Sequence, residues 1–262
     1  LVMAALFLQC SDYQKTLKSK DPELKFTKAV EYYKDGRCYQ ALPLFEELIA
    51  SVRGTQRAEE AYYYFAQTHY CIKDYYLANY YLKSFVKTFP TSQYAEECLF
   101  LAAMCSYQLS PKYTLDQTDT KLAIDDFQLF IDRYPSSNLK DSCNNMIGSL
   151  REKLELKSFE VAKLYHTTQR YRSAVVALQD ALDQYPGTVH KEEIMFLMVE
   201  SYFKFAEGSV DKKKLSRFKD TMDSYYKFVA NFPESSRLRE AESYFKQSQK
   251  EVERLKKEGY DI

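Results

Sequence analysis

A short phrase recurs four times along the 262 residues: an apolar, aromatic-rich run that ends in an aromatic residue followed by proline. The prolines that close the phrase are Pro90, Pro135, Pro186 and Pro233, at intervals of 45, 51 and 47 residues. Proline cannot continue a helix, and it drives the residue before it out of the helical backbone conformation. Because apolar side chains recur three and four positions apart before each stop, the pattern predicts an array of helical repeats.

The composition narrows the classes of function. Lysine plus arginine equals aspartate plus glutamate at 37 each, and no long basic run is present, which argues against nucleic acid and anionic lipid as partners. The chain has 24 tyrosines, 17 phenylalanines and no tryptophan. So many rings cannot all be fully buried, and exposed tyrosines are typical of contact surfaces with other proteins.

Three stretches share one spacing of small and aromatic residues. They are Ala29, Tyr32, Ala41, Phe45 and Leu48; Tyr62, Phe65, Ala66, His69, Ala78, Leu82, Phe85 and Pro90; and Val161, Ala162, Tyr165, Ala174, Leu178, Ala181 and Pro186. Alanine where two helices cross lets their backbones approach closely, and the rings fill the grooves beside the crossing. The spacing resembles the tetratricopeptide repeat (TPR). This resemblance implies an all-α fold, a right-handed α-solenoid of about five TPR-like helical hairpins.

The repeats divide the chain into two segments. Residues 21–136 are predicted to form the first three hairpins, beginning with Asp21 as the N-cap and Pro22 at the first helical position. Gly36 is expected to end the first helix in the left-handed conformation. Residues 137–262 are predicted to form the fourth and fifth hairpins.

Further elements are predicted between and after the hairpins. The run from residue 137 to about 166 has no proline and indicates a long connecting helix. Residues 234–258 are increasingly charged and indicate a C-terminal capping helix, which an α-solenoid needs for solubility. Two polar stretches, residues 110–120 and 207–217, are interpreted as solvated loops, the second with the run Lys212, Lys213 and Lys214.

The N-terminus carries an unbroken apolar run from Leu1 to Leu8, followed by Gln9 and Cys10. The run is too short to span a bilayer, which takes about 20 residues. It resembles the end of a bacterial lipoprotein signal, in which the cysteine is acylated after cleavage. Residues 1–9 are then a signal-peptide remnant and residues 10–20 a lipid-anchored tether. Gln9 departs from that pattern, which favours a small residue there, and the alternative is a first buried helix with an incidental cysteine.

The other cysteines show no metal or redox pattern. They form no CxxC pair and have no histidine at metal-binding spacing; these residues are Cys38, Cys71, Cys98, Cys105 and Cys143. Free cysteine is one of the most frequently buried residue types. All five are therefore interpreted as small apolar packing residues within helices.

No pattern in the sequence predicts catalysis, a metal site or a cofactor other than a lipid on Cys10. The three histidines, His69, His166 and His190, stand at no zinc or triad spacing, and phosphate-binding glycine loops and hydrolase motifs are missing from the sequence. Adjacent carboxylates such as Asp125 and Asp126 diverge on a helix and are interpreted as solvated faces. The sequence therefore predicts a binding protein and not an enzyme.

The whole chain also resembles the BamD family of the outer-membrane β-barrel assembly machinery, through Cys10, the polar residues 11–19 and the five TPR-like hairpins. The resemblance implies a lipid-anchored scaffold on the periplasmic face of the outer membrane. Its N-terminal repeats would bind unfolded outer-membrane proteins, with Tyr32, Tyr62, His69 and Tyr70 as candidate contacts. Its C-terminal repeats would dock on the periplasmic domains of the barrel insertase, with Arg170, Tyr171 and Arg172 as candidates. The alternative is a TPR lipoprotein adaptor for cell-wall synthesis or division enzymes.

Overall fold

The computed structural model describes residues 12–260, and every regular element among them is a helix. Residues 12–18 are helical and precede the labelled helices. Those are α2 (Pro22–Lys34), α3 (Cys38–Ser51), α4 (Ala58–Cys71), α5 (Tyr75–Thr88), α6 (Ala95–Leu109), α7 (Thr118–Arg133), α8 (Lys140–Thr167), α9 (Tyr171–Gln184), α10 (Lys191–Glu207), α11 (Asp211–Asn231) and α12 (Leu238–Lys257). The predicted all-α fold is confirmed. Within residues 12–260, no helix has the length and apolar character needed to cross a bilayer.

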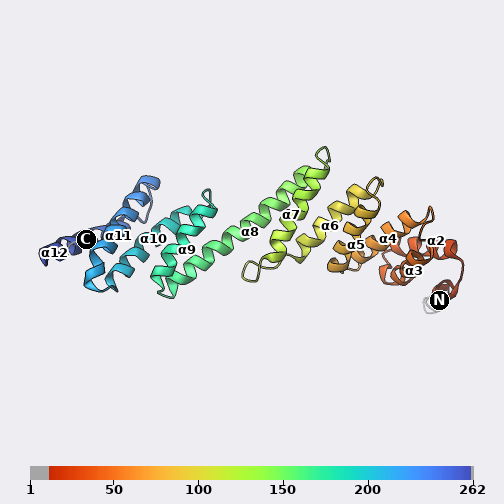
Figure 1. Ribbon diagram of the computed structural model, residues 1–262, viewed down its shortest axis with the longest axis horizontal. Coiled ribbons are helices and arrows are strands. Elements are labelled where there is room, and N and C mark those ends of the chain that lie inside the picture. Colours follow the sequence, from red (N-terminus) through yellow and green to blue (C-terminus); the bar gives the residue numbers. More distant parts are fainter. Residues whose placement is uncertain (1–11, 261–262) are drawn as a thin grey trace, which may run out of the picture. The chain divides into compact units, whose positions relative to one another are not determined.

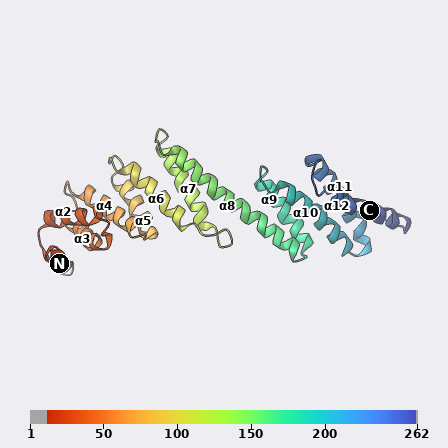
Figure 2. The same cartoon turned by 180° about the vertical axis from the view of Figure 1, so that it is seen from behind.

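The chain forms two compact units that divide within α8, between Arg151 and Glu152. In unit 1, the helices follow one another in chain order as the hairpins α2–α3, α4–α5 and α6–α7 (Figure 1). In unit 2, the end of α8 shares a core with α9, α10 packs on α11, and α12 contacts both α10 and α11 (Figure 2). The long helix and the C-terminal helix are present where the sequence predicts them. The predicted boundary between residues 136 and 137 separates the first three hairpins from the last two, and it stays a prediction.

Three hairpin turns place one residue in the left-handed backbone conformation. In the first hairpin this residue is Gly36 (φ 73°), as predicted, and the side chain of Asp21 accepts hydrogen bonds from the first turn of α2. Lys73 (φ 63°) and Gln169 (φ 60°) take the same place in the second and fourth hairpins. In all three turns the N–H of the left-handed residue donates a hydrogen bond to the carbonyl three residues earlier. The N–H of the next residue donates to the carbonyl five residues before it. These two hydrogen bonds satisfy carbonyls at the end of the helix. They also stabilise the left-handed conformation at Lys73 and Gln169, where glycine is the usual residue.

Alanines mark the places where helices touch, as the repeat pattern predicts. Ala66 in α4 and Ala174 in α9 are fully buried, each within the core of its unit. We expect Ala66→Leu and Ala174→Leu each to lower the free energy of unfolding by about 1–3 kcal/mol, because the larger side chain overpacks the crossing. The control is Ala50→Leu at an exposed position of α3, with an expected change within about 0.5 kcal/mol. Urea denaturation measures all three, and equal stability of Ala66→Leu and Ala50→Leu would contradict close helix approach.

One of the two predicted loops is wrong. The stretch 110–117 joins α6 to α7 as a loop, but the second stretch is helical from Asp211 onward, so that Lys212 and Lys213 lie in the first turn of α11. Leu215 and Phe218 are buried there in a cluster that also contains Val252 of α12. Burial of those two side chains by another helix holds α11 in place although its first turn is strongly charged.

Asp126 is buried, which corrects its interpretation as part of a solvated carboxylate pair. Its carboxylate accepts hydrogen bonds from Lys83 Nζ at 2.6 and 2.8 Å and from the Ser106 hydroxyl at 2.6 Å. Asn79 Nδ2 donates to the carbonyl of Ala102 at 2.7 Å and lies 3.3 Å from the same carboxylate. One carboxylate thus joins α5, α6 and α7. The neighbouring Asp125 is exposed.

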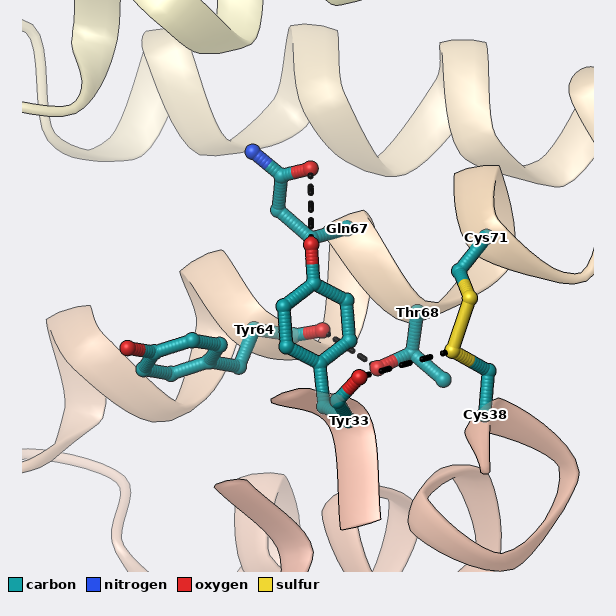
Figure 3. Close-up of a disulfide and its surroundings, with 6 residues drawn as sticks. All are labelled: Tyr33, Cys38, Tyr64, Gln67, Thr68 and Cys71. Atoms are coloured by element: carbon teal, nitrogen blue, oxygen red, sulfur yellow. Dashed lines mark hydrogen bonds between the residues drawn. A yellow bond between two sulfur atoms is a disulfide. The ribbon is translucent and has the colours of Figure 1, made fainter. Parts of the chain in front are cut away.

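Cys38 and Cys71 form a disulfide, which corrects their interpretation as separate packing residues. Cys38 begins α3 and is buried, whereas Cys71 ends α4 and is exposed. Their Cα atoms lie 6.2 Å apart, so the bond fastens the first hairpin to the second (Figure 3). Cys98, Cys105 and Cys143 are free and buried, as predicted, and burial raises the pKa of each thiol.

Candidate functional site

A groove of about 530 Å³ opens in unit 1 where α3, α4 and α5 meet, and we call it the α3–α5 groove. Its apolar lining consists of Ile49, Val52, Ala58, Tyr62 and Phe89. Its polar lining consists of Arg53, Gly54, Thr55, Ser84 and Thr88. The groove therefore combines an apolar surface with a few polar groups, which is the usual composition of a protein ligand site.

The local sequence explains how the groove forms. Gly54 has φ 80° and turns the chain between α3 and α4, and the Thr55 hydroxyl donates to the Val52 carbonyl at 2.7 Å. Pro90 follows the end of α5, so Phe89 leaves the helix and lines the groove. The recurring aromatic-proline phrase thus supplies one wall of the site as well as the end of a helix.

Tyr62 provides the aromatic surface of the groove. Its ring stacks on Phe85 at 6.0 Å and meets the edge of Tyr81 at 6.4 Å. Burial raises the pKa of Tyr62, and a hydrogen bond with the Ser84 side chain opposes that shift. The ring is half-buried, so it is fixed by its neighbours and still presents a surface to the groove.

Arg53 gives the groove a positive charge. It is exposed and forms no ion pair within the described part of the chain, and the lining includes no carboxylate. An unpaired guanidinium favours a carboxylate, which it can bind through two parallel hydrogen bonds. The groove can therefore hold apolar or aromatic side chains that lie next to a carboxylate.

Of the four predicted substrate contacts, two are partly exposed and two are buried. Tyr62 lines the groove, and Tyr70 is half-buried beside Tyr75, with ring centroids 5.8 Å apart. Tyr32 and His69 are only 5% and 4% exposed. Their burial argues against direct contact with a substrate, because each ring is already covered by neighbouring helices. For Tyr62 and Tyr70 the role stays a prediction.

His69 has an unusual interior environment. Its ring lies 4.8 Å from the Phe65 ring and 5.0 Å from the Tyr81 ring, measured between centroids. Neither ring nitrogen has a hydrogen-bond partner among residues 12–260. Burial lowers the pKa of His69, and the carboxylates of Asp74 and Glu46 only partly oppose this shift. The folded protein therefore holds the neutral imidazole.

We expect the free energy of unfolding of unit 1 to fall as the pH drops below about 6.5, the usual histidine pKa. Below that pH the unfolded chain binds a proton at His69 that the folded chain does not, with a slope of at most about 1.4 kcal/mol per pH unit. His69→Phe should remove this contribution and flatten the profile. Urea denaturation of both proteins from pH 8 to pH 5 measures it, and parallel profiles would contradict a neutral buried His69.

A second surface of unit 1 carries tyrosines that the sequence pattern did not single out. The Tyr33 hydroxyl donates to Gln67 at 3.5 Å (Figure 3), and Gln67 and the Tyr63 hydroxyl donate to Glu97 at 3.0 and 2.9 Å. Tyr63 also stacks on Tyr94 at 4.1 Å. These bonds join α2, α4 and α6, the first helices of three hairpins. The pairs Tyr33–Gln67 and Tyr63–Glu97 are both 34 residues apart, which equals the repeat length and could have revealed them.

In unit 2, the three predicted docking residues lie together at the start of α9. Arg170 and Arg172 are exposed, and Tyr171 is half-buried with its ring 5.8 Å from that of His166. His166 Nδ1 lies 2.9 Å from the Ser201 hydroxyl, and its Nε2 lies 3.4 Å from Glu200. Ser201 is fully buried, so this arrangement joins α8 to α10 and presents no nucleophile to solvent. The docking role of the three residues stays a prediction.

Two further predictions concern the lipid anchor and metal binding. Cys10 and the signal remnant lie outside the described residues. No group of three or more histidine, cysteine, aspartate or glutamate side chains within residues 12–260 is placed to hold a metal ion.

Comparison with known proteins decides the family. A family model described as "Outer membrane lipoprotein", YfiO, matches residues 18–216, which is most of the chain. The chain belongs to this family. Three relatives carry the description "Outer membrane protein assembly factor BamD", and the predicted resemblance to BamD is thereby confirmed.

The three relatives are distant in sequence. The protein from Haemophilus influenzae is 22% identical, over 78% of this chain and 82% of its own length. The Pasteurella multocida protein is 19% identical over the same shares. The Rickettsia prowazekii protein is 24% identical, over 52% of this chain and 54% of its own. The family assignment rests on the family model, which matches residues 18–216.

Proposed function

We propose that this chain is a non-catalytic, lipid-anchored scaffold in outer-membrane protein assembly, in which unit 1 binds unfolded outer-membrane proteins through the α3–α5 groove. Unit 2 docks on the periplasmic domains of the barrel insertase, and the lipid is carried by Cys10. Family membership and the names of the three relatives support the general role. The observation that carries the substrate site is an open groove combining the Tyr62 ring with the unpaired Arg53.

The chemistry of the groove suggests which part of a substrate binds. An extended chain can place an aromatic or aliphatic side chain against Ile49, Tyr62 and Phe89. A terminal carboxylate beside that side chain would reach Arg53 at the rim. We therefore propose that the groove holds the C-terminal end of an outer-membrane β-barrel chain. The Cys38–Cys71 disulfide supports a location in an oxidising compartment such as the periplasm.

The groove is tested with a fluorescent peptide copied from the C-terminal strand of an outer-membrane β-barrel of the same organism, made as the free acid and as the C-terminal amide. Binding to the full chain is measured by fluorescence anisotropy. The free acid should bind more tightly, and Arg53→Gln should abolish the difference between the two peptides. Thr88→Trp should weaken both by about fivefold or more, because the indole fills the groove from an exposed position.

The matched control is Thr27→Trp, an exposed position of α2 that does not line the groove. It should leave both affinities unchanged. Equal binding by wild type and Thr88→Trp would rule out the groove.

Purification from detergent-solubilised outer membrane tests the docking role. The barrel insertase should be the main protein recovered, whereas recovery of cell-wall enzymes alone would favour the adaptor alternative. Radiolabelled palmitate should enter the wild type and not Cys10→Ser.

A further inference from the structure

Unit 2 contains a second pocket at the same place in the hairpin array as the α3–α5 groove. It lies between α9 and α11, over α10, and has a volume of about 290 Å³. We call it the α9–α11 pocket. Its apolar side chains are Leu182, Pro186, Met195 and Met198. Both methionines belong to the core of unit 2, so the pocket is an opening into that core.

The charged side chains that line this pocket are both positive. Lys191 from α10 and Lys227 from α11 line it, and no carboxylate does. Neither lysine forms an ion pair within residues 12–260. Two unpaired ammonium groups beside an apolar surface favour a ligand that is apolar and carries a negative charge next to its apolar part.

The polar side chains of the pocket indicate what bears that charge. The amide nitrogen of Asn231 donates to the Lys227 carbonyl at 2.9 Å, and that of Gln179 donates to Asp183 at 2.8 Å. Their amide oxygens accept no hydrogen bond from another residue in the range 12–260, so each can still accept one. A polypeptide supplies backbone N–H donors for such oxygens, whereas an alkyl carboxylate has none.

We propose that the α9–α11 pocket binds a partner polypeptide through one large apolar side chain flanked by an aspartate or glutamate. The apolar side chain contacts Met195 and Met198, whose flexible thioethers adapt to different shapes. The carboxylate lies between Lys191 and Lys227. The volume, near the lower end of the usual range of about 300–1,000 Å³ for ligand pockets, suits a side chain better than a large cofactor. The proposal does not require the partner to be the barrel insertase.

The test uses two short synthetic peptides that differ only in the residues beside one central phenylalanine, which are acidic in one peptide and basic in the other. The full chain is labelled with ¹³C at the methionine methyl groups, and binding is followed by NMR. The acidic peptide should shift the signals of Met195 and Met198 and leave Met222, which lies outside the pocket, unmoved. The basic peptide should shift neither.

Variants then separate the pocket from general surface charge. Lys191→Gln combined with Lys227→Gln should raise the Kd of the acidic peptide about fivefold. Lys212→Gln combined with Lys213→Gln removes the same charge from an exposed turn of α11 and should leave the Kd unchanged. Equal binding of both peptides, or unmoved Met195 and Met198 signals, would overturn the proposal. The proposal would also be overturned if octanoate shifted the Met195 and Met198 signals and the acidic peptide did not, because the ligand would then be an alkyl carboxylate. None of these outcomes depends on the substrate groove of unit 1.

Discussion

Replacing both Cys38 and Cys71 by alanine is expected to lower the free energy of unfolding of unit 1 by about 2–4 kcal/mol. The disulfide joins residues 33 positions apart and therefore restricts the unfolded chain, which would otherwise regain that freedom. It also fixes the start of α3 against the end of α4, whereas the α3–α5 groove lies at the other ends of these two helices. Hydrogen exchange should show faster opening of α3 and α4 in the double variant, while α10 and α11 of unit 2 keep their protection.

Reduction of the wild type provides the matched control for this prediction. Cys71 is exposed, so dithiothreitol can reach the bond, and it should lower the denaturation midpoint of the wild type. The double variant should not respond to the same reductant. A wild type whose stability is indifferent to dithiothreitol would show that the bond contributes nothing in solution. Because Cys38 is buried, part of any loss in the double variant is lost packing, and the reductant isolates the covalent part.

Asp126→Ala is expected to cost about 2–4 kcal/mol of stability, the second large effect. The substitution leaves the Ser106 hydroxyl without its acceptor, weakens the anchoring of Asn79 and removes the partner of Lys83. Loss of one member of a buried ion pair typically costs about 3–5 kcal/mol. The Asp126 side chain is 7% exposed, but that of Lys83 is 33% exposed and can turn to water, which reduces the cost.

Asp125→Ala, at the exposed neighbouring position, is the control and should change the stability by less than about 0.5 kcal/mol. Urea denaturation measures both variants. A double-mutant cycle with Lys83→Met separates the ion pair from the bonds to Ser106 and Asn79. If Asp126→Ala and Asp125→Ala unfold at the same urea concentration, the carboxylate does not join the three helices in solution.

The pattern of apolar residues and prolines predicted the helices and their pairing, except for the first turns of α11, for which a loop was predicted. Asp21 and Gly36 also marked the ends of α2, because N-caps and left-handed turns restrict the residue types strongly. At the equivalent turns, Lys73 and Gln169 stand where glycine is usual, so the sequence gives no signal of a helix end there. There the chain reverses because apolar faces on both sides must pack, and the backbone accepts an unfavourable residue at the turn.

The contact surfaces were predicted less well, for a related reason. Tyr62, Tyr63 and Tyr64 are consecutive, and their periodicity alone does not show which ring faces a groove. Packing of α3 and α5 against α4 puts Tyr62 in the α3–α5 groove, and it buries His69 between Phe65 and Tyr81.

By itself, the sequence determined the helical repeat, its stops and the family, because these depend on spacing within one helix or one hairpin. Only the tertiary structure decided the Cys38–Cys71 bond, the burial of Asp126 and the two pockets beside α4 and α10. Each of these depends on contacts between side chains of different helices, which spacing within one helix does not fix. The aromatic-proline phrase shows the difference: its proline ends α5 wherever that helix lies, but Phe89 becomes part of a binding surface only once α3 and α4 pack beside it.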